Sequence, residues 1–184
     1  MGHHTFDSDR ADKLEGEGRF RYLSAEELRW ALDLTGTDTV ADLGSGTGFF
    51  TDVVAPDSGT TYAVDLQSAM HDYYRDKGVP ENVELVTSDV ADMPFDDDAL
   101  DAAFATMTYH EFASEAALAE VARVLAPGGR LVVVDWAASG EGANGPPLDE
   151  RYGLEDAVEA LQHAGFAVEF DAQRSETFFL TATR

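Results

Sequence analysis

The chain has 184 residues, 44% of them hydrophobic, which is enough to bury a substantial core and argues against disorder. It carries 36 Asp and Glu residues against 12 Lys and Arg residues, and the resulting formal net charge of −24 repels nucleic acid and anionic membranes. Cysteine is absent, which excludes disulfides, thiol nucleophiles and thiolate metal sites.

Residues 1–23 form a predicted polar arm of a single domain that covers residues 1–184. The arm contains His3 and His4, for which we expect no metal role, and its start lacks the apolar stretch of a signal peptide. The richest apolar run, residues 131–138, is interrupted by Asp135 and is too short to span a bilayer. We therefore expect a cytoplasmic protein with no membrane association, and its acidity resembles proteins of salt-accumulating (halophilic) microbes.

After Ser24, a predicted N-cap for a helix that continues to Leu34, strands and helices alternate along the chain. Expected strands cover residues 39–43, 61–65, 83–87, 102–106 and 130–135, and expected helices cover about 48–55, 67–77 and 114–126. The run Pro127-Gly128-Gly129 is expected to stop the last of these helices. This alternation predicts an α/β fold with a doubly wound, mostly parallel, Rossmann-like sheet.

The C-terminal part follows a different pattern. A helix near residues 154–164 should stop at Gly165, and residues 166–170 and 177–183 look like two strands with a short polar connection. Strands connected in this way pair antiparallel. The Gly- and Pro-rich segment 139–152 is the one long irregular stretch, and we expect it to form a loop over the site.

Residues 40–48, Val-Ala-Asp-Leu-Gly-Ser-Gly-Thr-Gly, are the most informative motif for function. An apolar strand runs into Asp42 and then into glycines at alternate positions, Gly44, Gly46 and Gly48, before a predicted helix. Glycine allows a sharp turn and a close approach of the backbone to a ligand. A strand, a glycine turn and a helix in this order form nucleotide sites in α/β folds, so we predict an adenosine-containing cofactor.

Two classes of cofactor compete for this turn. A dinucleotide fingerprint requires a third glycine where Phe49 stands, although Asp65, at the end of the second strand, suits the ribose of either class. Asp42 would repel a pyrophosphate but suits an ammonium group, and Asp89 could accept a hydrogen bond from an adenine amino group. S-adenosylmethionine carries an ammonium and a sulfonium and no phosphate. The alternatives are a plain turn residue for Asp42 and an N-cap for Asp89.

With Ala-Val-Asp at 63–65, Ser-Asp-Val at 88–90 and Arg-Val-Leu-Ala-Pro-Gly-Gly-Arg-Leu at 123–131, the chain resembles class I S-adenosylmethionine-dependent methyltransferases over roughly residues 28–183. Within that family, its compact form and Gly-Pro-Pro at 145–147 resemble the small-molecule enzymes similar to quinone-biosynthesis methyltransferases. The resemblance implies that Gly44 and Gly46 pack against the methionine end, with Asp42 near the amino group or its bound water. It also implies Asp65 at the ribose, and Asp89 with the Val90 backbone at adenine. The full predicted cofactor set is Asp42, Gly44, Ser45, Gly46, Asp65, Leu66, Asp89, Val90 and Thr106.

The acceptor side follows the fourth predicted strand, where residues 106–112 are Thr-Met-Thr-Tyr-His-Glu-Phe. An Asn-Pro-Pro-Tyr type of motif is missing, which disfavours N-methylation of nucleic-acid bases. If the acceptor arrives protonated, His110 or Glu111 could act as the base, whereas the alternative is that both only cap a helix or line the pocket. We expect Arg151 at the surface, paired with Glu150 or Glu155, in preference to a contact with an anionic acceptor.

The sequence therefore predicts methyl transfer from S-adenosylmethionine to a small-molecule acceptor by in-line displacement, with S-adenosylhomocysteine as the product. The predicted catalytic residues are His110 and Glu111, without a metal ion or nucleic acid. Two rivals stay open: an NAD-type Rossmann oxidoreductase, and a non-catalytic protein that binds S-adenosylmethionine.

Overall fold

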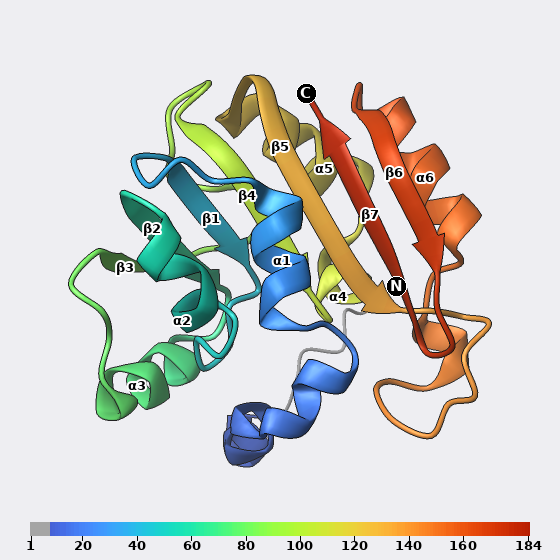
Figure 1. Cartoon of the computed structure of the whole chain (residues 1–184), viewed down its shortest axis with the longest axis horizontal. Helices are drawn as coiled ribbons and strands as arrows, with labels where there is room; N and C mark the ends of the chain where they lie inside the picture. Colours follow the sequence, from blue (N-terminus) through green and yellow to red (C-terminus); the bar gives the residue numbers. More distant parts are fainter. Residues whose placement is uncertain (1–7) are drawn as a thin grey trace.

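The computed structural model describes residues 8–184, so His3 and His4 lie outside the described residues. Its centre is one sheet of seven strands in the order β3-β2-β1-β4-β5-β7-β6 (Figure 1). The strands are β1 (Thr39–Leu43), β2 (Thr60–Asp65), β3 (Val83–Thr87), β4 (Leu100–Thr106), β5 (Leu125–Trp136), β6 (Ala167–Gln173) and β7 (Thr177–Thr183). The first five are parallel, and β7 pairs antiparallel with both β5 and β6. The predicted α/β fold with its closing antiparallel pair is confirmed.

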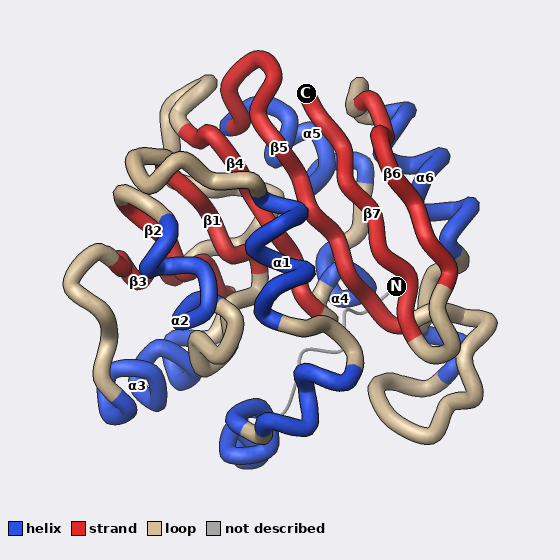
Figure 2. Tube along the Cα trace, in the orientation of Figure 1, coloured by secondary structure: helices blue, strands red, loops and turns tan. Residues whose placement is uncertain are grey.

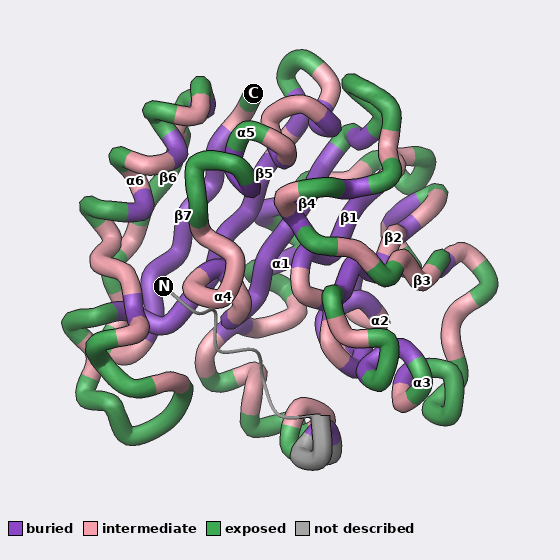
Figure 3. Tube along the Cα trace, turned by 180° about the vertical axis from the view of Figure 1, so that it is seen from behind, coloured by how far each residue is buried: buried purple, intermediate pink, exposed green. Residues whose placement is uncertain are grey.

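Helices cover both faces of the sheet (Figures 1 and 2). Helices α1 (Ala25–Leu32) and α2 (Thr51–Val54) lie on one face, and α5 (Glu115–Val124) and α6 (Leu154–His163) lie on the other. Helix α3 (Ser68–Lys77) packs near β2 and β3, and the short α4 (Tyr109–Phe112) follows β4. Two large apolar cores result, with a third, smaller cluster around Tyr74 of α3, and the central strands are buried (Figure 3).

Helix α1 shows why these residues form the predicted element. The Ser24 hydroxyl accepts a hydrogen bond from the backbone N–H of Glu27, and the Glu27 carboxylate accepts one from the backbone N–H of Ser24. This reciprocal cap satisfies N–H groups that have no partner inside the helix. Leu28, Ala31 and Leu32 are buried on the inward face, as their spacing predicts, and Asp33 ends the helix in a left-handed conformation.

Some predicted boundaries were wrong, and tertiary pairing explains the shifts. Helix α2 begins at Thr51, because the glycine turn extends further than predicted. Helix α5 ends at Val124, because Leu125 already pairs with Leu100 of β4. The Pro127-Gly128-Gly129 run consequently lies within β5, beside a register shift, and does not terminate the helix.

The N-terminal segment, defined here as residues 8–21, consists of two 3₁₀ helices, Ser8–Glu15 and Glu17–Arg21. It lies below α1 at the edge of the sheet where the parallel strands have their carboxyl ends (Figure 1). Over the described part of the chain, no helix has the length and apolar character needed to cross a membrane.

Candidate active site

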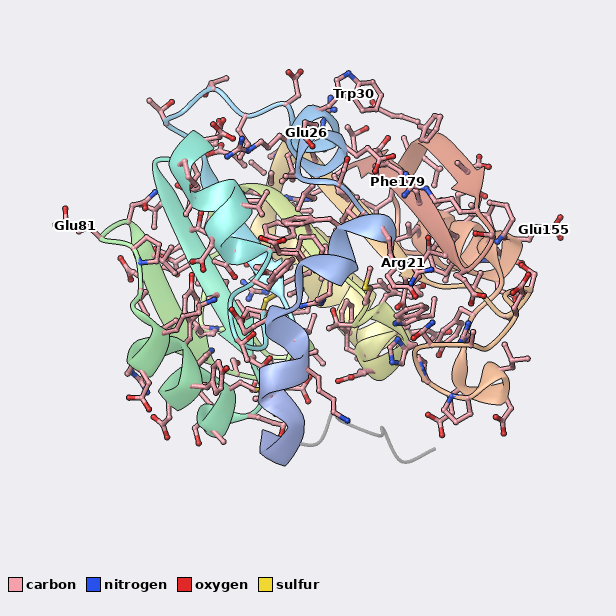
Figure 4. All side chains as sticks on the ribbon, turned by 60° about the horizontal axis from the view of Figure 1, so that its bottom comes forward. Arg21, Glu26, Trp30, Glu81, Glu155 and Phe179 are labelled. Atoms are coloured by element: carbon pink, nitrogen blue, oxygen red, sulfur yellow. The ribbon has the colours of Figure 1, made fainter. Side chains whose placement is uncertain are left out.

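A cavity of about 880 Å³ opens at the carboxyl edge of the parallel strands. Its walls come from the ends of β1 to β5, the N-terminal segment and the loop that carries residues 144–150. Figure 4 looks towards this edge and shows the N-terminal segment crossing in front of the sheet, with Arg21 near the middle of the view. Every predicted site residue except Asp42 lines the cavity: Gly44, Ser45, Gly46, Asp65, Leu66, Asp89, Val90, Thr106, His110 and Glu111.

The glycine turn after β1 has a backbone that only glycine adopts easily. Gly44 has a φ of 78°, and a Cβ atom there would lie 2.7 Å from the side chain of Thr108. The backbone N–H groups of Gly44 and Ser45 both donate to the carbonyl of Val64, which ties the turn to β2. The Ser45 hydroxyl is buried and has no hydrogen-bond partner among the described residues, and the residue lines the cavity.

Asp65, at the end of β2, is held by backbone N–H groups on both sides. Gly46 donates to Oδ2 and Gln67 donates to Oδ1, each at 2.8 Å. A carboxylate oxygen accepts more than one hydrogen bond, so Asp65 keeps acceptor capacity towards the cavity. Its neighbour Leu66 is 56% exposed and forms part of the cavity rim.

Asp89 and Val90 follow β3 and form the adjoining wall. The Asp89 carboxylate accepts a hydrogen bond from the backbone N–H of Ala91 at 2.9 Å, which fixes its side chain in a local turn. Val90 is buried, and Thr106, at the end of β4, is buried next to the cavity as well. These residues come from separate strands, and the parallel register brings them to one edge of the sheet.

Asp42 lies beneath the glycine turn and does not line the cavity. The hydroxyl of Thr51 donates to its Oδ2 at 2.7 Å, whereas Oδ1 has no partner among the described residues. Burial raises the pKa of Asp42 to about 7, although the bond from Thr51 and the charge of Arg19 act in the opposite direction. Any influence of Asp42 on a ligand is therefore exerted through the turn or through charge.

His110, on the short helix α4, is held in the cavity wall by Asp135. Asp135 of β5 is fully buried; one oxygen accepts the backbone N–H of His110 at 2.6 Å, and its carboxylate lies 3.0 Å from the imidazole Nδ1. The Nε2 atom lies 3.9 Å from a Glu111 carboxylate oxygen. Burial disfavours the charged imidazole, but the hydrogen bond and charge of Asp135, with a smaller contribution from Glu111, raise the pKa of His110 above its usual value.

The remaining walls are largely aromatic and apolar. The Tyr22 and Trp136 rings meet edge to face with centroids 4.7 Å apart, and both residues line the cavity beside Met107 and Phe112. The loop segment 144–147 closes the same side, in agreement with the expectation that residues 139–152 cover the site. This arrangement can hold a planar or apolar group near His110.

A family model described as a methyltransferase domain matches residues 41–133, about half of the chain. This chain belongs to that methyltransferase family. It is 32% identical over 149 residues to an uncharacterized methyltransferase of Mycobacterium tuberculosis, a match that covers 74% of this chain and 60% of the relative. A ubiquinone/menaquinone biosynthesis C-methyltransferase of Pseudomonas syringae is 34% identical over 120 residues, covering 59% of this chain and 46% of that protein. This chain therefore spans only about half to 60% of the length of these curated relatives.

Solved structures resemble the methyltransferase over more of its length. A S-adenosylmethionine-dependent methyltransferase from Aquifex aeolicus has a TM-score of 0.86 and 28% identity, covering 97% of this chain and 99% of that one. A [4+2]-cyclase, SpnF, has a TM-score of 0.76 at 20% identity, covering 100% of this chain and 86% of that one. The second similarity concerns the fold alone, and it shows that proteins with this fold are named for more than one reaction.

The sequence-based prediction was wrong for Arg151 and did not include Arg19. Arg151 is not at the surface: its side chain is fully buried, and it donates to the carbonyls of Pro146 and Asn144 and pairs with Glu176, not with Glu150 or Glu155. Arg19 was not considered, yet it lines the cavity from the N-terminal segment. No periodicity or motif marks Arg19, whereas Asp135 stands out in the sequence as the acid that interrupts an apolar run, although its pairing with His110 was not predicted.

The described part of the methyltransferase contains no group of three His, Asp or Glu side chains arranged to hold a metal ion. His71 is buried on α3, with Nδ1 at 3.0 Å from the Thr87 hydroxyl. Burial lowers the pKa of His71, which keeps its ring neutral at neutral pH. His110 is accordingly the one histidine that lines the cavity among the residues described.

Proposed function

We propose that this methyltransferase takes a methyl group from S-adenosylmethionine and transfers it to a small-molecule acceptor. The observation that carries the proposal is that the glycine turn, Asp65 and His110, which is paired with the buried Asp135, line one cavity of about 880 Å³. Small-molecule sites have volumes of about 300–1,000 Å³, so this one is at the large end. Its size supports the presence of an acceptor beside a cofactor.

The cavity residues fit the chemical groups of S-adenosylmethionine. Gly44 and Gly46 would face the methionine end, where the unpartnered Ser45 hydroxyl offers one more hydrogen bond. Asp65 would bind the ribose hydroxyls, and Asp89 with Val90 would contact the adenine. The cofactor supplies an electrophilic methyl carbon bound to a sulfonium. This assignment is supported by the residues that line the cavity. It is also supported by the resemblance of the chain to S-adenosylmethionine-dependent enzymes such as the Aquifex aeolicus protein.

His110 is proposed as the general base for the acceptor. Asp135 accepts the Nδ1 proton, which leaves the Nε2 lone pair to take a proton from an acceptor hydroxyl or amine. The same carboxylate stabilises the imidazolium that forms. The N-terminal segment and the loop around residues 144–147 form two walls of the cavity. Because methyl transfer requires an in-line approach, these walls also serve to align the acceptor.

The raised pKa of His110 sets the direction of the pH dependence. The base must be neutral to accept a proton, so turnover should increase with pH through a value above the usual 6.5. The variant Asp135→Asn removes the charge that raises this pKa, so the increase should move to lower pH. Its amide can also donate to Nδ1 and thereby select the wrong imidazole tautomer, which in hydrolases with a His–Asp pair costs on the order of 10⁴ in rate.

Isothermal titration with S-adenosylmethionine, S-adenosylhomocysteine and NAD tests the cofactor. We expect the first two ligands to bind and NAD not to bind, because Phe49 occupies the third glycine position and packs against Phe20 and Phe50. Binding of NAD alone would instead support the oxidoreductase. Turnover of a methyl-labelled donor with a metabolite extract then separates an enzyme from a non-catalytic binder, and label transfer should depend on His110.

A further inference from the structure

The N-terminal segment is anchored directly against the glycine turn. Glu15 accepts a hydrogen bond from the Thr47 hydroxyl and forms an ion pair with Lys77 of α3 at 3.2 Å. A Cβ atom built on Gly46 would lie 3.3 Å from the side chain of Leu14. The segment therefore packs against the same backbone that is proposed to bind the cofactor.

Arg19 is the cation that this packing brings into the cavity wall. Its guanidinium carbon lies 5.1 Å and 4.9 Å from the ring centroids of Phe49 and Phe50, which follow the turn. One of its nitrogens donates to the carbonyl of Leu14 at 2.9 Å. Arg19 forms no ion pair with another described residue, so donors of its guanidinium remain available to a ligand.

Arg19 is half-buried in the cavity wall, where a charge without a partner is costly. Burial lowers the pKa of Arg19 to about 10, whereas the negative charges of Asp42 and Glu15 act to raise it. The side chain therefore remains positive at neutral pH. Asp42 lies under the turn and Glu15 is already paired with Lys77. A ligand carboxylate in the cavity would supply the missing partner with the planar geometry that guanidinium prefers.

We propose that Arg19 binds the carboxylate of the methionine end of the cofactor, an inference that rests on the proposed function. The site is rich in acids, and the whole chain carries a formal net charge of −24, so a carboxylate there requires a cation. The other described Lys and Arg residues that line the cavity are Lys13, which is exposed, and Arg21, which lies over the Tyr22 ring. Arg19 alone among the three contacts the phenylalanines that follow the turn.

The test compares S-adenosylmethionine with decarboxylated S-adenosylmethionine, which keeps the ammonium and the sulfonium and lacks the carboxylate. Titration of the full chain should show that the wild type prefers the intact cofactor by about 10–100-fold, the size of a hydrogen-bonded charge pair. In Arg19→Gln this preference should fall to about threefold or less. The matched control Arg21→Gln should keep the wild-type preference, and Arg19→Lys should retain part of it.

Three results would overturn the inference. Arg19→Gln could keep the full preference, it could weaken both ligands equally, or Arg21→Gln could be the variant that loses the preference. Failure of the wild type to bind either ligand would refute the proposed function as well, and is thus distinct from a failure of the Arg19 assignment alone. Thermal melting of each variant shows that it is folded, and Arg19→Lys provides the test if Arg19→Gln is not.

Discussion

Replacing Asp65 with alanine removes a carboxylate that the backbone already uses. Both oxygens accept backbone N–H groups, from Gly46 and Gln67, at 2.8 Å. Hydrogen bonds to a charged acceptor contribute about 1.5–3 kcal/mol each, and because the buried Asp65 lines the cavity, water in Asp65→Ala can replace part of this. We therefore expect Asp65→Ala to lower the free energy of unfolding by about 2–4 kcal/mol.

The effect on cofactor binding should come in addition to this loss of stability. If Asp65 binds the ribose, the variant also loses two charge-assisted hydrogen bonds to the ligand, which we expect to weaken binding by about 2–3 kcal/mol in total. That free energy corresponds to an increase in Kd of about 30–150-fold. Asp65→Asn should be intermediate, because its amide nitrogen would face one of the two backbone N–H groups.

Isothermal titration with S-adenosylhomocysteine at fixed salt measures the change, and thermal melting checks that each variant is folded. Asp72→Ala is a suitable control, because Asp72 is an exposed carboxylate on α3 that pairs with Arg75. The control should bind like the wild type. If folded Asp65→Ala binds S-adenosylhomocysteine within about threefold of the wild type, the ribose assignment and the reasoning above are refuted.

Three further predictions concern catalysis, a buried acid and salt. His110→Ala should keep S-adenosylhomocysteine affinity within a few-fold but reduce turnover about 10²–10⁴-fold, and Glu111→Gln should reduce it less; wild-type turnover of His110→Ala would exclude a base. Because burial raises the pKa of Asp42 from 3.8 to about 7, the free energy of unfolding should lose about 4 kcal/mol from this group as the pH rises from 3.8 to 7; urea titration measures the loss, and Asp42→Asn should remove this contribution. The melting temperature should rise steeply from dilute buffer to molar KCl, as the Debye length falls from about 30 Å to about 3 Å. A melting temperature that does not change with salt would contradict the reasoning that repulsion between the acidic side chains destabilises the fold.

The sequence predicted the sheet well because its strands are short apolar runs with turn residues on both sides. The bounds of β1, β3 and β7 agree with the prediction, and the shifts at α5 and β5 arise from the pairing of Leu125 with Leu100, which no local pattern contains. The ends of parallel strands share one edge of a sheet, so the residues predicted from Gly44 to His110 line one cavity.

How deeply a side chain is buried, and which distant residues it contacts, could not be predicted in the same way. The position of Asp42 beneath the turn depends on the bond from Thr51, and the orientation of His110 depends on Asp135, which is 25 residues away in sequence. Arg19 enters the cavity wall only because a segment without periodicity folds back across the glycine turn. Arg151 was wrongly expected at the surface, because the carbonyls that surround it belong to a loop with no sequence pattern.

The buried Arg151 holds the loop of residues 139–152 together through hydrogen bonds to the loop's own backbone and to Ala137. Its guanidinium donates to the carbonyls of Ala137, Asn144 and Pro146, and Tyr152 forms a bridge with Ala137, so both ends of the loop are held at Ala137, directly after β5. The loop between Ala137 and Tyr152 can differ in length and composition without altering the glycine turn or Asp65. Under the proposed function, exchange of the loop between Ala137 and Tyr152 is a route to change acceptor specificity while the glycine turn and Asp65 stay constant.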